Sequence, residues 1–146
     1  MGATGPIAIL EFCGYGSLYQ QLVKMMDCKA GAISELLVVK ILVDLSAGLK
    51  ACHDAGVVHL DMKTENCLVD ASMNLKIADF GTSLFVDEEG MKSKYPSRGT
   101  KTWMSPEMKK KEPILTTKSD IWGLGCIMYS VCTLQQWINH SKPYDT

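Results

Sequence analysis

Apolar side chains recur at helical spacing in two long stretches of the chain. The first stretch follows Ser34 and places five of them on one face: Leu37, Ile41, Leu45, Leu49 and Cys52. Ser34 is a residue type that favours the N-cap of a helix, and Gly56 is a fitting stop after Ala55. We therefore expect a long helix from Ser34 to about Ala55.

The second stretch, Lys118–Leu134, predicts a helix with Thr116 or Thr117 as its N-cap. Its apolar residues lie all round the expected helix: Ile121, Trp122, Leu124, Ile127, Met128, Tyr129, Val131 and Leu134. A helix that is apolar on every side is typical of a fully buried position. We expect it to be the central helix of the domain, with Trp122 and also Trp103 as core anchors.

Shorter patterns predict the connecting elements. Ile7–Phe12 has the pattern of a short buried strand, Val57-Val58 that of a very short one, and Ser17 is expected to cap a helix that runs to about Met26. Cys67–Val69 and Leu75–Ile77 flank a turn, which predicts a small hairpin. Thr82–Thr102 is polar and has no sustained period, so we expect a long mobile loop there. The sum is an α+β unit that is mainly α-helical.

The composition of the chain limits the classes of function that it can have. The chain has 146 residues, 47% hydrophobic and 21% charged, which suits one globular domain. Its net charge of -1 points to neither a nucleic-acid partner nor an anionic membrane. The longest apolar stretch, Ile121–Leu134, is shorter than the roughly 20 residues that span a bilayer. Six cysteines without a CxxC pair are expected to be free thiols, which favours the cytoplasm and leaves the nucleus open.

Four polar residues form a set with chemical meaning. Lys63 and Asn66 follow Asp61 closely, and Asp79 comes after the predicted hairpin, which would bring it near Asn66. An amide oxygen and a carboxylate are ligands that suit Mg²⁺. The lysine would neutralise charge on a transferring phosphoryl group, and Asp61 would orient a hydroxyl nucleophile. These are the parts that phosphoryl transfer needs.

The same residues carry a family resemblance. The segment His59–Asn66 resembles the protein-kinase catalytic loop H-R-D-L-x-x-x-N, and Asp79-Phe80-Gly81 matches D-F-G. Ser105-Pro106-Glu107 resembles A-P-E, and Lys118–Gly125 resembles the start of the family's central helix. The chain thus resembles a eukaryotic-type Ser/Thr protein kinase from the hinge onward, and it is most similar to NIMA-related and neighbouring kinases. Lys63, two residues after Asp61, favours Ser/Thr rather than tyrosine kinases.

The resemblance implies a fold and an active site. The fold would be the mainly helical large, C-terminal lobe, with a short hinge strand and small hairpins. Asp61 would accept or orient the proton of a Ser/Thr hydroxyl in a protein substrate, Lys63 would steady the γ-phosphate of ATP, and Asn66 and Asp79 would hold Mg²⁺. The other expected ATP contacts are Leu10 as gatekeeper, Glu11 and Cys13 at the adenine, Glu65, and Leu68 as the floor under the base.

Further residues have expected supporting roles by the same resemblance. His59 would pack on Phe80 beside Gly81, and Thr100 would hydrogen-bond near Asp61 and Lys63. Asp120 would brace the backbone of the catalytic loop. Glu107 would pair in the family with a later arginine, which this sequence does not contain.

The sequence departs from the kinase pattern in two ways that change the function we expect. Leu60 replaces the arginine that usually pairs with an activation-loop phosphate, so we hypothesise that loop phosphorylation is not the main on-switch. The sequence also has no Gly-rich loop and strand lysine, so residues 1–146 are expected to form a partial kinase domain without the small lobe and the last helices. The alternative is an inactive, pseudokinase-like interaction module whose truncated faces are covered by a protein partner.

Overall fold

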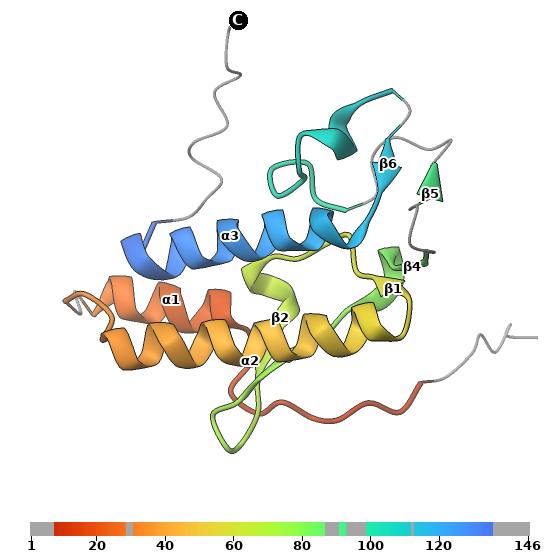
Figure 1. The fold of residues 1–146 in the computed structure, drawn as a ribbon. Helices are drawn as coiled ribbons and strands as arrows, with labels where there is room; N and C mark the ends of the chain where they lie inside the picture. Colours follow the sequence, from red (N-terminus) through yellow and green to blue (C-terminus); the bar gives the residue numbers. More distant parts are fainter. Residues whose placement is uncertain (1–7, 29–30, 87–90, 93–98, 112, 136–146) are drawn as a thin grey trace, which may run out of the picture.

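The computed structural model describes residues 8–28, 31–86, 91–92, 99–111 and 113–135. Its body consists of the helices α1 (Leu18–Asp27), α2 (Glu35–Asp54) and α3 (Thr117–Thr133), and α3 packs along α2 (Figure 1). Three short 3-10 helices join them: η1 (Thr64–Asn66), η2 (Phe80–Thr82) and η3 (Glu107–Lys109). The architecture of helices with small strands agrees with the expected α+β class.

The strands of the described chain form three two-stranded antiparallel sheets. β1 (Val57–Val58) pairs with β4 (Leu84–Phe85), and β2 (Cys67–Val69) pairs with β3 (Leu75–Ile77). β5 (Met91–Lys92) pairs with β6 (Ile114–Leu115). The β2–β3 hairpin has the predicted boundaries, and Asp70 stabilises its turn by accepting hydrogen bonds from the N–H groups of Ser72 and Asn74, both at 2.9 Å.

Local capping signals set the helix ends as predicted. The hydroxyl of Ser17 accepts a hydrogen bond from the N–H of Gln20, whose side chain bonds back to Ser17 in a capping box. Ser34 caps α2 with a single bond, because its hydroxyl accepts a hydrogen bond from the N–H of Leu37. Gly56 follows α2 with φ 71°, in the left-handed region that glycine tolerates best.

Two predictions for the connecting segments are wrong. Residues 8–13 contain no strand, and Ile9, Leu10 and Phe12 are almost fully exposed, since no other described segment pairs with them. Ile7 lies outside the described residues. The segment 82–102, expected to be loop throughout, contains β4 and β5, because their partners β1 and β6 are supplied by distant parts of the chain. Its residues 87–90 and 93–98 lie outside the described part.

Helix α3 is buried on one face rather than on every side. Ile127 and Val131 are fully buried, whereas the side chains of Ile121 and Trp122 are 53% and 41% exposed. No described segment covers this outer face, so the prediction that Trp122 anchors the core is wrong. Trp103, at 5% exposure, is a core residue as predicted.

Two apolar clusters form the interior. The larger one lies between the three helices and is centred on Leu45, Leu49 and Ile127. The second, smaller cluster is formed by five buried residues and two half-buried ones: Val58, Leu60, Met104, Met108, Leu115, Leu84 and Val86. Within the described ranges, none of the helices has both the length and the apolar character required to cross a bilayer.

Candidate active site

Asp120 of α3 binds the backbone of the loop that follows β1. This carboxylate is 1% exposed and accepts hydrogen bonds from the backbone N–H groups of His59 (2.9 Å) and Leu60 (2.8 Å). The Nε2–H of His53 in α2 donates to the same carboxylate at 2.8 Å. Leu60 itself has φ 67°, a left-handed conformation that a branched side chain rarely adopts. The three hydrogen bonds to Asp120 therefore stabilise an unusual loop geometry.

His59 connects this loop to the segment before Asp79. Its Nε2–H donates to the carbonyl oxygen of Ala78 at 3.0 Å, and its Nδ1 accepts from the N–H of Asp61 at 3.3 Å. A carbonyl can only accept, so the ring carries its proton on Nε2. The ring of Phe80 packs against His59 edge to face, with centroids 5.0 Å apart. His59 is thus a structural bridge between two chemically important segments.

Sequence reasoning missed two further contacts to this bridge. The hydroxyls of Thr82 and Ser83 donate to the carbonyl oxygen of His59 at 3.1 and 3.2 Å. Neither residue belongs to a motif with a distinctive spacing, so nothing in the sequence singled them out.

The carboxylate of Asp61 accepts hydrogen bonds from three residues of the site. Its Oδ1 accepts from the N–H of Thr100 at 2.7 Å, and its Oδ2 lies 2.8 Å from the Nζ of Lys63 and 3.0 Å from the Nδ2 of Asn66. Burial alone would raise the pKa of Asp61, but the hydrogen bonds from Lys63 and Thr100 outweigh it and hold that pKa below its usual range. The carboxylate is therefore ionised at neutral pH.

Thr100 joins Asp61 and Lys63 from a distant part of the chain. Its hydroxyl accepts a hydrogen bond from the Nζ of Lys63 at 2.8 Å. The preceding residue, Gly99, has φ 86°, and a Cβ added there would lie 2.3 Å from the carbonyl oxygen of Leu60. Only glycine fits this close approach, which brings Thr100 onto the loop.

Asn66 and Asp79 offer oxygen atoms that suit Mg²⁺. The amide nitrogen of Asn66 donates to the carbonyl oxygen of Asp61 at 2.9 Å and to its carboxylate, which leaves the amide oxygen available. The carbonyl oxygen of Asn66 accepts from the N–H of Ala78 at 2.9 Å, so Asp79 follows directly on this contact. Asp79 is exposed and accepts from the N–H of Gly81 at 3.2 Å. The donor set fits a hard cation, although no cluster of three or more acidic, His or Cys groups stands among the described residues.

The residues expected at the adenine are only partly brought together. Leu10 is 83% exposed in the irregular segment, and Glu11 forms an exposed ion pair with Lys76 at 3.4 Å. The carbonyl oxygen of Cys13 accepts from the N–H of Gly16. Leu68, half-buried in β2, lies opposite Ser17 in an isolated antiparallel bridge, so the segment after Cys13 runs along β2. The expected gatekeeper is therefore not packed against the expected floor.

The carboxylates of Glu65 and Glu107 each accept a hydrogen bond from a hydroxyl group. Glu65 is half-buried, and its carboxylate accepts from the Thr64 hydroxyl at 3.1 Å. Glu107 accepts from the hydroxyl of Ser119 at 3.0 Å. Burial would raise the pKa of Glu107, but the hydrogen bonds that its carboxylate accepts lower it. The family resemblance implied an arginine as the partner of Glu107. In this chain the hydroxyl of Ser119 binds Glu107 instead.

The thiols of the described chain are free, as expected from the sequence. Burial raises the pKa of Cys67 to about 12 and that of Cys126 to about 11. Both thiols therefore stay protonated at neutral pH and act as small apolar groups in the core.

Comparison with known proteins identifies relatives of the chain. The sequence model of the protein kinase domain matches residues 6–145. The chain is 33% identical over 128 residues to the serine/threonine-protein kinase Nek5 of Mus musculus, a match that covers 87% of this chain and 20% of Nek5. This match is consistent with the similarity to NIMA-related kinases expected from the sequence.

Two relatives from Arabidopsis thaliana are equally similar. The serine/threonine-protein kinase RUNKEL is 33% identical and the serine/threonine/tyrosine-protein kinase HT1 is 34% identical, each over 125 residues and 86% of this chain. These matches cover 9% of RUNKEL and 30% of HT1, so the chain spans less than a third of each of these relatives.

Proposed function

The chain belongs to the protein kinase family, and from this membership we propose that it carries the substrate-side half of an ATP-dependent Ser/Thr kinase site. The observation that supports the proposal most directly is the environment of Asp61. An ionised, 7% exposed carboxylate is held by Lys63, Asn66 and Thr100, and each of these partners donates to it. Such a group is positioned to act on a hydroxyl rather than to stabilise the fold alone.

In the proposed reaction each polar residue of the site has a separate role. Asp61 orients the Ser/Thr hydroxyl of a protein substrate and accepts its proton. Lys63, which already spans from Asp61 to Thr100, would stabilise the charge on the transferring phosphoryl group. Thr100 is a positioning residue, because its N–H and its hydroxyl hold both charged side chains in place.

Mg²⁺ would be held by the amide oxygen of Asn66 and the carboxylate of Asp79, and when bound it would neutralise charge on the phosphates of ATP. His59 supports both ligand segments through its bonds to Asp61 and Ala78. Because two protein oxygens do not complete the coordination of Mg²⁺, the remaining positions would be taken by phosphate oxygens and water.

The proposal is tested on the whole protein, since this chain covers only part of its relatives. Transfer of radiolabelled phosphate from Mg-ATP to Ser/Thr peptides would be compared for the native protein, Asp61→Asn and the matched control Asp54→Asn. Asp54 is an exposed α2 residue that pairs only with Lys50 among the described groups. We expect Asp61→Asn to lower kcat by about 100-fold or more and the control to keep its activity. Equal activity of the three proteins would contradict the proposal.

A second candidate function is a non-catalytic interaction module. The observation that favours it is the apolar groove on the outer face of α3, where Ile114, Ile121 and Trp122 are exposed side by side in one concave surface. Apolar surfaces of this kind often mark protein contacts. A whole protein that neither binds Mg-ATP in calorimetry nor transfers phosphate would favour this function over the kinase.

A further inference from the structure

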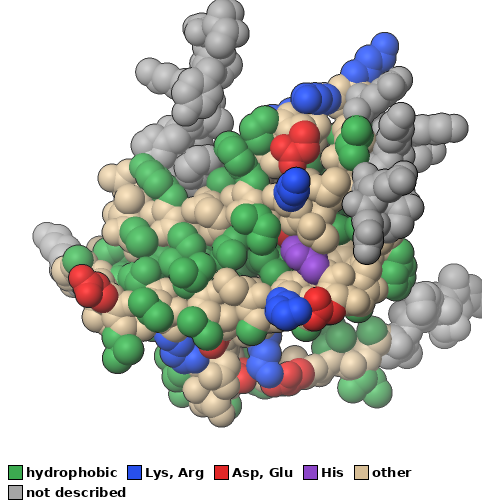
Figure 2. Space-filling view, in the orientation of Figure 1, with side chains coloured by type: hydrophobic (Ala, Val, Ile, Leu, Met, Phe, Trp, Pro, Cys, Tyr) green, Lys and Arg blue, Asp and Glu red, His purple; other side chains and the backbone are tan. Residues whose placement is uncertain are grey.

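Five exposed lysines project from the segment 99–118, which packs around the proposed catalytic loop. We call them together the lysine surface: Lys101, Lys109, Lys110, Lys111 and Lys118. In Figure 2 basic side chains lie at the top of the view, over the region of η3 and β6. The sequence of this segment carries the five lysines against two glutamates, whereas the whole chain has 15 basic and 16 acidic residues. Positive charge is therefore concentrated here.

The lysine surface is not neutralised by carboxylates of the described chain. None of its ammonium groups forms an ion pair within the described ranges, whereas four other lysines do: Lys40, Lys50, Lys63 and Lys76. Glu107, the one acidic residue that the structure describes between positions 99 and 118, is half-buried and accepts a hydrogen bond from Ser119. The positive field of the surface thus remains available to a partner.

Lys101 lies next to a residue that binds the proposed catalytic carboxylate. It follows Thr100 directly, and the N–H of Thr100 donates to Asp61 at 2.7 Å. The carbonyl oxygen of Thr100 accepts from the N–H of Trp103 at 2.9 Å, which closes a turn with Lys101 at an exposed position. A protein substrate whose hydroxyl lies at Asp61 would therefore have its neighbouring residues within reach of this long side chain.

The three consecutive lysines are positioned by the packing of η3. Met108 of η3 is 3% exposed and belongs to the buried cluster that contains Leu60, the residue before Asp61. The chain leaves this cluster after Met108, and the next three residues, 109–111, are all exposed lysines. The same core contacts that fix Leu60 therefore also fix the origin of these three charges.

We propose that the lysine surface binds Asp and Glu residues of the protein substrate that flank the phosphorylated Ser or Thr. The inference rests on the proposed kinase function and adds the class of substrate to it, namely acidic protein segments. Exposed charges of one sign attract a partner of the opposite sign and repel one of the same sign. Because these lysines are not placed at the reacting atoms, the effect is expected on KM rather than on kcat.

An anionic membrane is the competing partner for a basic surface. An extended anionic surface would also face the acidic residues that dominate the rest of the chain, since the whole chain has a net charge of -1. A short acidic segment can instead contact the lysine surface alone. The distribution of charge therefore favours an acidic protein segment.

The test uses peptides of about 15 residues with one central Ser, in which the flanking positions carry Glu, Ala or Lys in turn. Such a peptide is roughly 50 Å long when extended, so its flanks reach well beyond the site. We expect the whole protein to phosphorylate the best Glu peptide with a kcat/KM about fivefold or more above that of the Ala peptide, and the Lys peptide more slowly.

The outcomes separate this inference from the kinase function. Equal kcat/KM values, or a preference for Lys, would overturn the acidic-substrate inference and leave the kinase function standing. Absence of transfer to every peptide would overturn both. The preference for Glu should also fall below about twofold in roughly 0.5 M sodium chloride, because salt screens exposed charges. A preference that survives this salt concentration would come from a different kind of contact and contradict the inference.

Two double variants assign the preference to the lysine surface. Lys109→Glu combined with Lys111→Glu should lower the preference for Glu over Ala by about threefold or more, with the Ala peptide phosphorylated as in the native protein. Lys24→Glu combined with Lys50→Glu is the matched control, because it reverses two exposed lysines of α1 and α2. If both double variants keep the preference, or both lose it equally, the surface does not select the substrate and the inference is wrong.

Sedimentation with vesicles of phosphatidylcholine and phosphatidylserine tests the competing partner. We expect the native protein and the variant with Lys109→Glu and Lys111→Glu to sediment to the same extent. Vesicle binding that this variant loses, together with no preference for Glu peptides, would identify a membrane as the partner and overturn the inference.

Discussion

Leu60 and Asp120 are joined by a 2.8 Å hydrogen bond from the backbone N–H of Leu60 to Oδ1 of Asp120. The second oxygen of the same carboxylate accepts from the N–H of His59 at 2.9 Å. Two successive backbone donors of the loop are thus satisfied by one buried side chain from α3. This arrangement connects the position of the proposed catalytic loop to the packing of α3.

Replacing this carboxylate should destabilise the whole domain. Asp120→Ala leaves two buried N–H groups without acceptors, which is expected to lower the free energy of unfolding by about 3 kcal/mol. Urea unfolding of the whole protein measures the change. Asp54→Ala, which removes only an exposed ion pair with Lys50, serves as the control and should cost about 0.5 kcal/mol or less. Similar losses in both variants would contradict the bracing role.

Two glycines of α3 should respond to alanine in opposite directions. A Cβ at Gly123 would lie 2.6 Å from the Cβ of Met62, so Gly123→Ala must push α3 away from the loop and should cost about 1–3 kcal/mol. Gly125 has no neighbouring atom within 4 Å of such a Cβ. Gly125→Ala should therefore stabilise the helix by up to about 1 kcal/mol. If the two substitutions change the free energy of unfolding in the same direction, α3 does not pack on Met62 in this way.

Leu60 should tolerate an apolar replacement but not a charge. It is buried in the cluster that contains Met104 and Leu115, so Leu60→Arg would bury an unpaired guanidinium and should cost about 3 kcal/mol or more. Leu60→Met should cost less than about 1.5 kcal/mol. Denaturant unfolding of both variants tests this difference, and equal stability would place the Leu60 side chain outside the core.

The same residue bears on regulation. Leu60 cannot bind a phosphate and instead packs in the buried cluster that contains Met104, Met108 and Leu115. We therefore expect the phosphorylation activity of the whole protein to survive treatment with a phosphatase that is removed before the assay. Mass spectrometry would verify complete dephosphorylation. Loss of activity that returns on rephosphorylation would show that a phosphate switch operates without the arginine.

Lys63 should control the ionisation of Asp61. The pKa of this carboxyl is held below its ordinary value of 3.8, so its contribution to stability is present above that value and is lost as the pH falls through the lowered pKa. Lys63→Met removes a donor and a positive charge, so the pKa of Asp61 should rise. NMR titration of ¹³C-labelled aspartate carboxyls measures it. Lys40→Met, which affects Asp44, is the control, and an unchanged Asp61 titration in Lys63→Met would contradict the proposed coupling.

Local signals explain which elements could be predicted. Ser17 and Ser34 cap their helices through neighbours three residues away, and the Asp70 turn closes the β2–β3 hairpin through residues two and four positions on. Such contacts depend on short stretches of chain, so the residue pattern is sufficient to reveal them. Lys63 and Asn66, which bind Asp61, lie within five residues of it, so the short motif was sufficient to reveal them as well.

The exposure of α3 shows where the pattern was insufficient. Ile121 and Trp122 are as apolar as Ile127, and the helical periodicity alone gave no reason to separate them. Their exposure depends on whether another segment covers the outer face of the helix. That is a property of packing partners and not of the helix.

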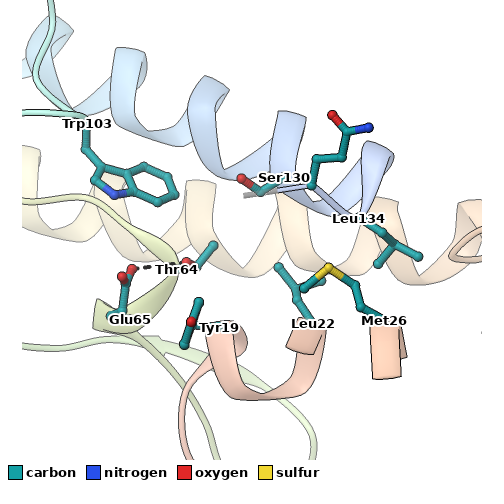
Figure 3. Close-up of a pocket in the computed structure, with 9 residues that line it drawn as sticks. Tyr19, Leu22, Met26, Thr64, Glu65, Trp103, Ser130 and Leu134 are labelled. Carbon is teal, nitrogen blue, oxygen red and sulfur yellow. Dashed lines mark hydrogen bonds between the residues drawn. The ribbon is translucent and has the colours of Figure 1, made fainter. Parts of the chain in front are cut away.

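The sequence alone determined the family, the helix caps, the hairpin and the identity of the polar residues at the proposed site. The family resemblance already implied that Thr100 lies near Asp61 and that Asp120 braces the loop. Only the tertiary structure decided which atoms meet across these 39 and 60 positions, and that Trp103 and Ser130 line a hollow beside Glu65 (Figure 3). The physical reason is the distance along the sequence between the residues that interact. Caps and turns use neighbouring residues, whereas the site is assembled from donors and acceptors that meet only after the apolar faces of α2 and α3 have packed together.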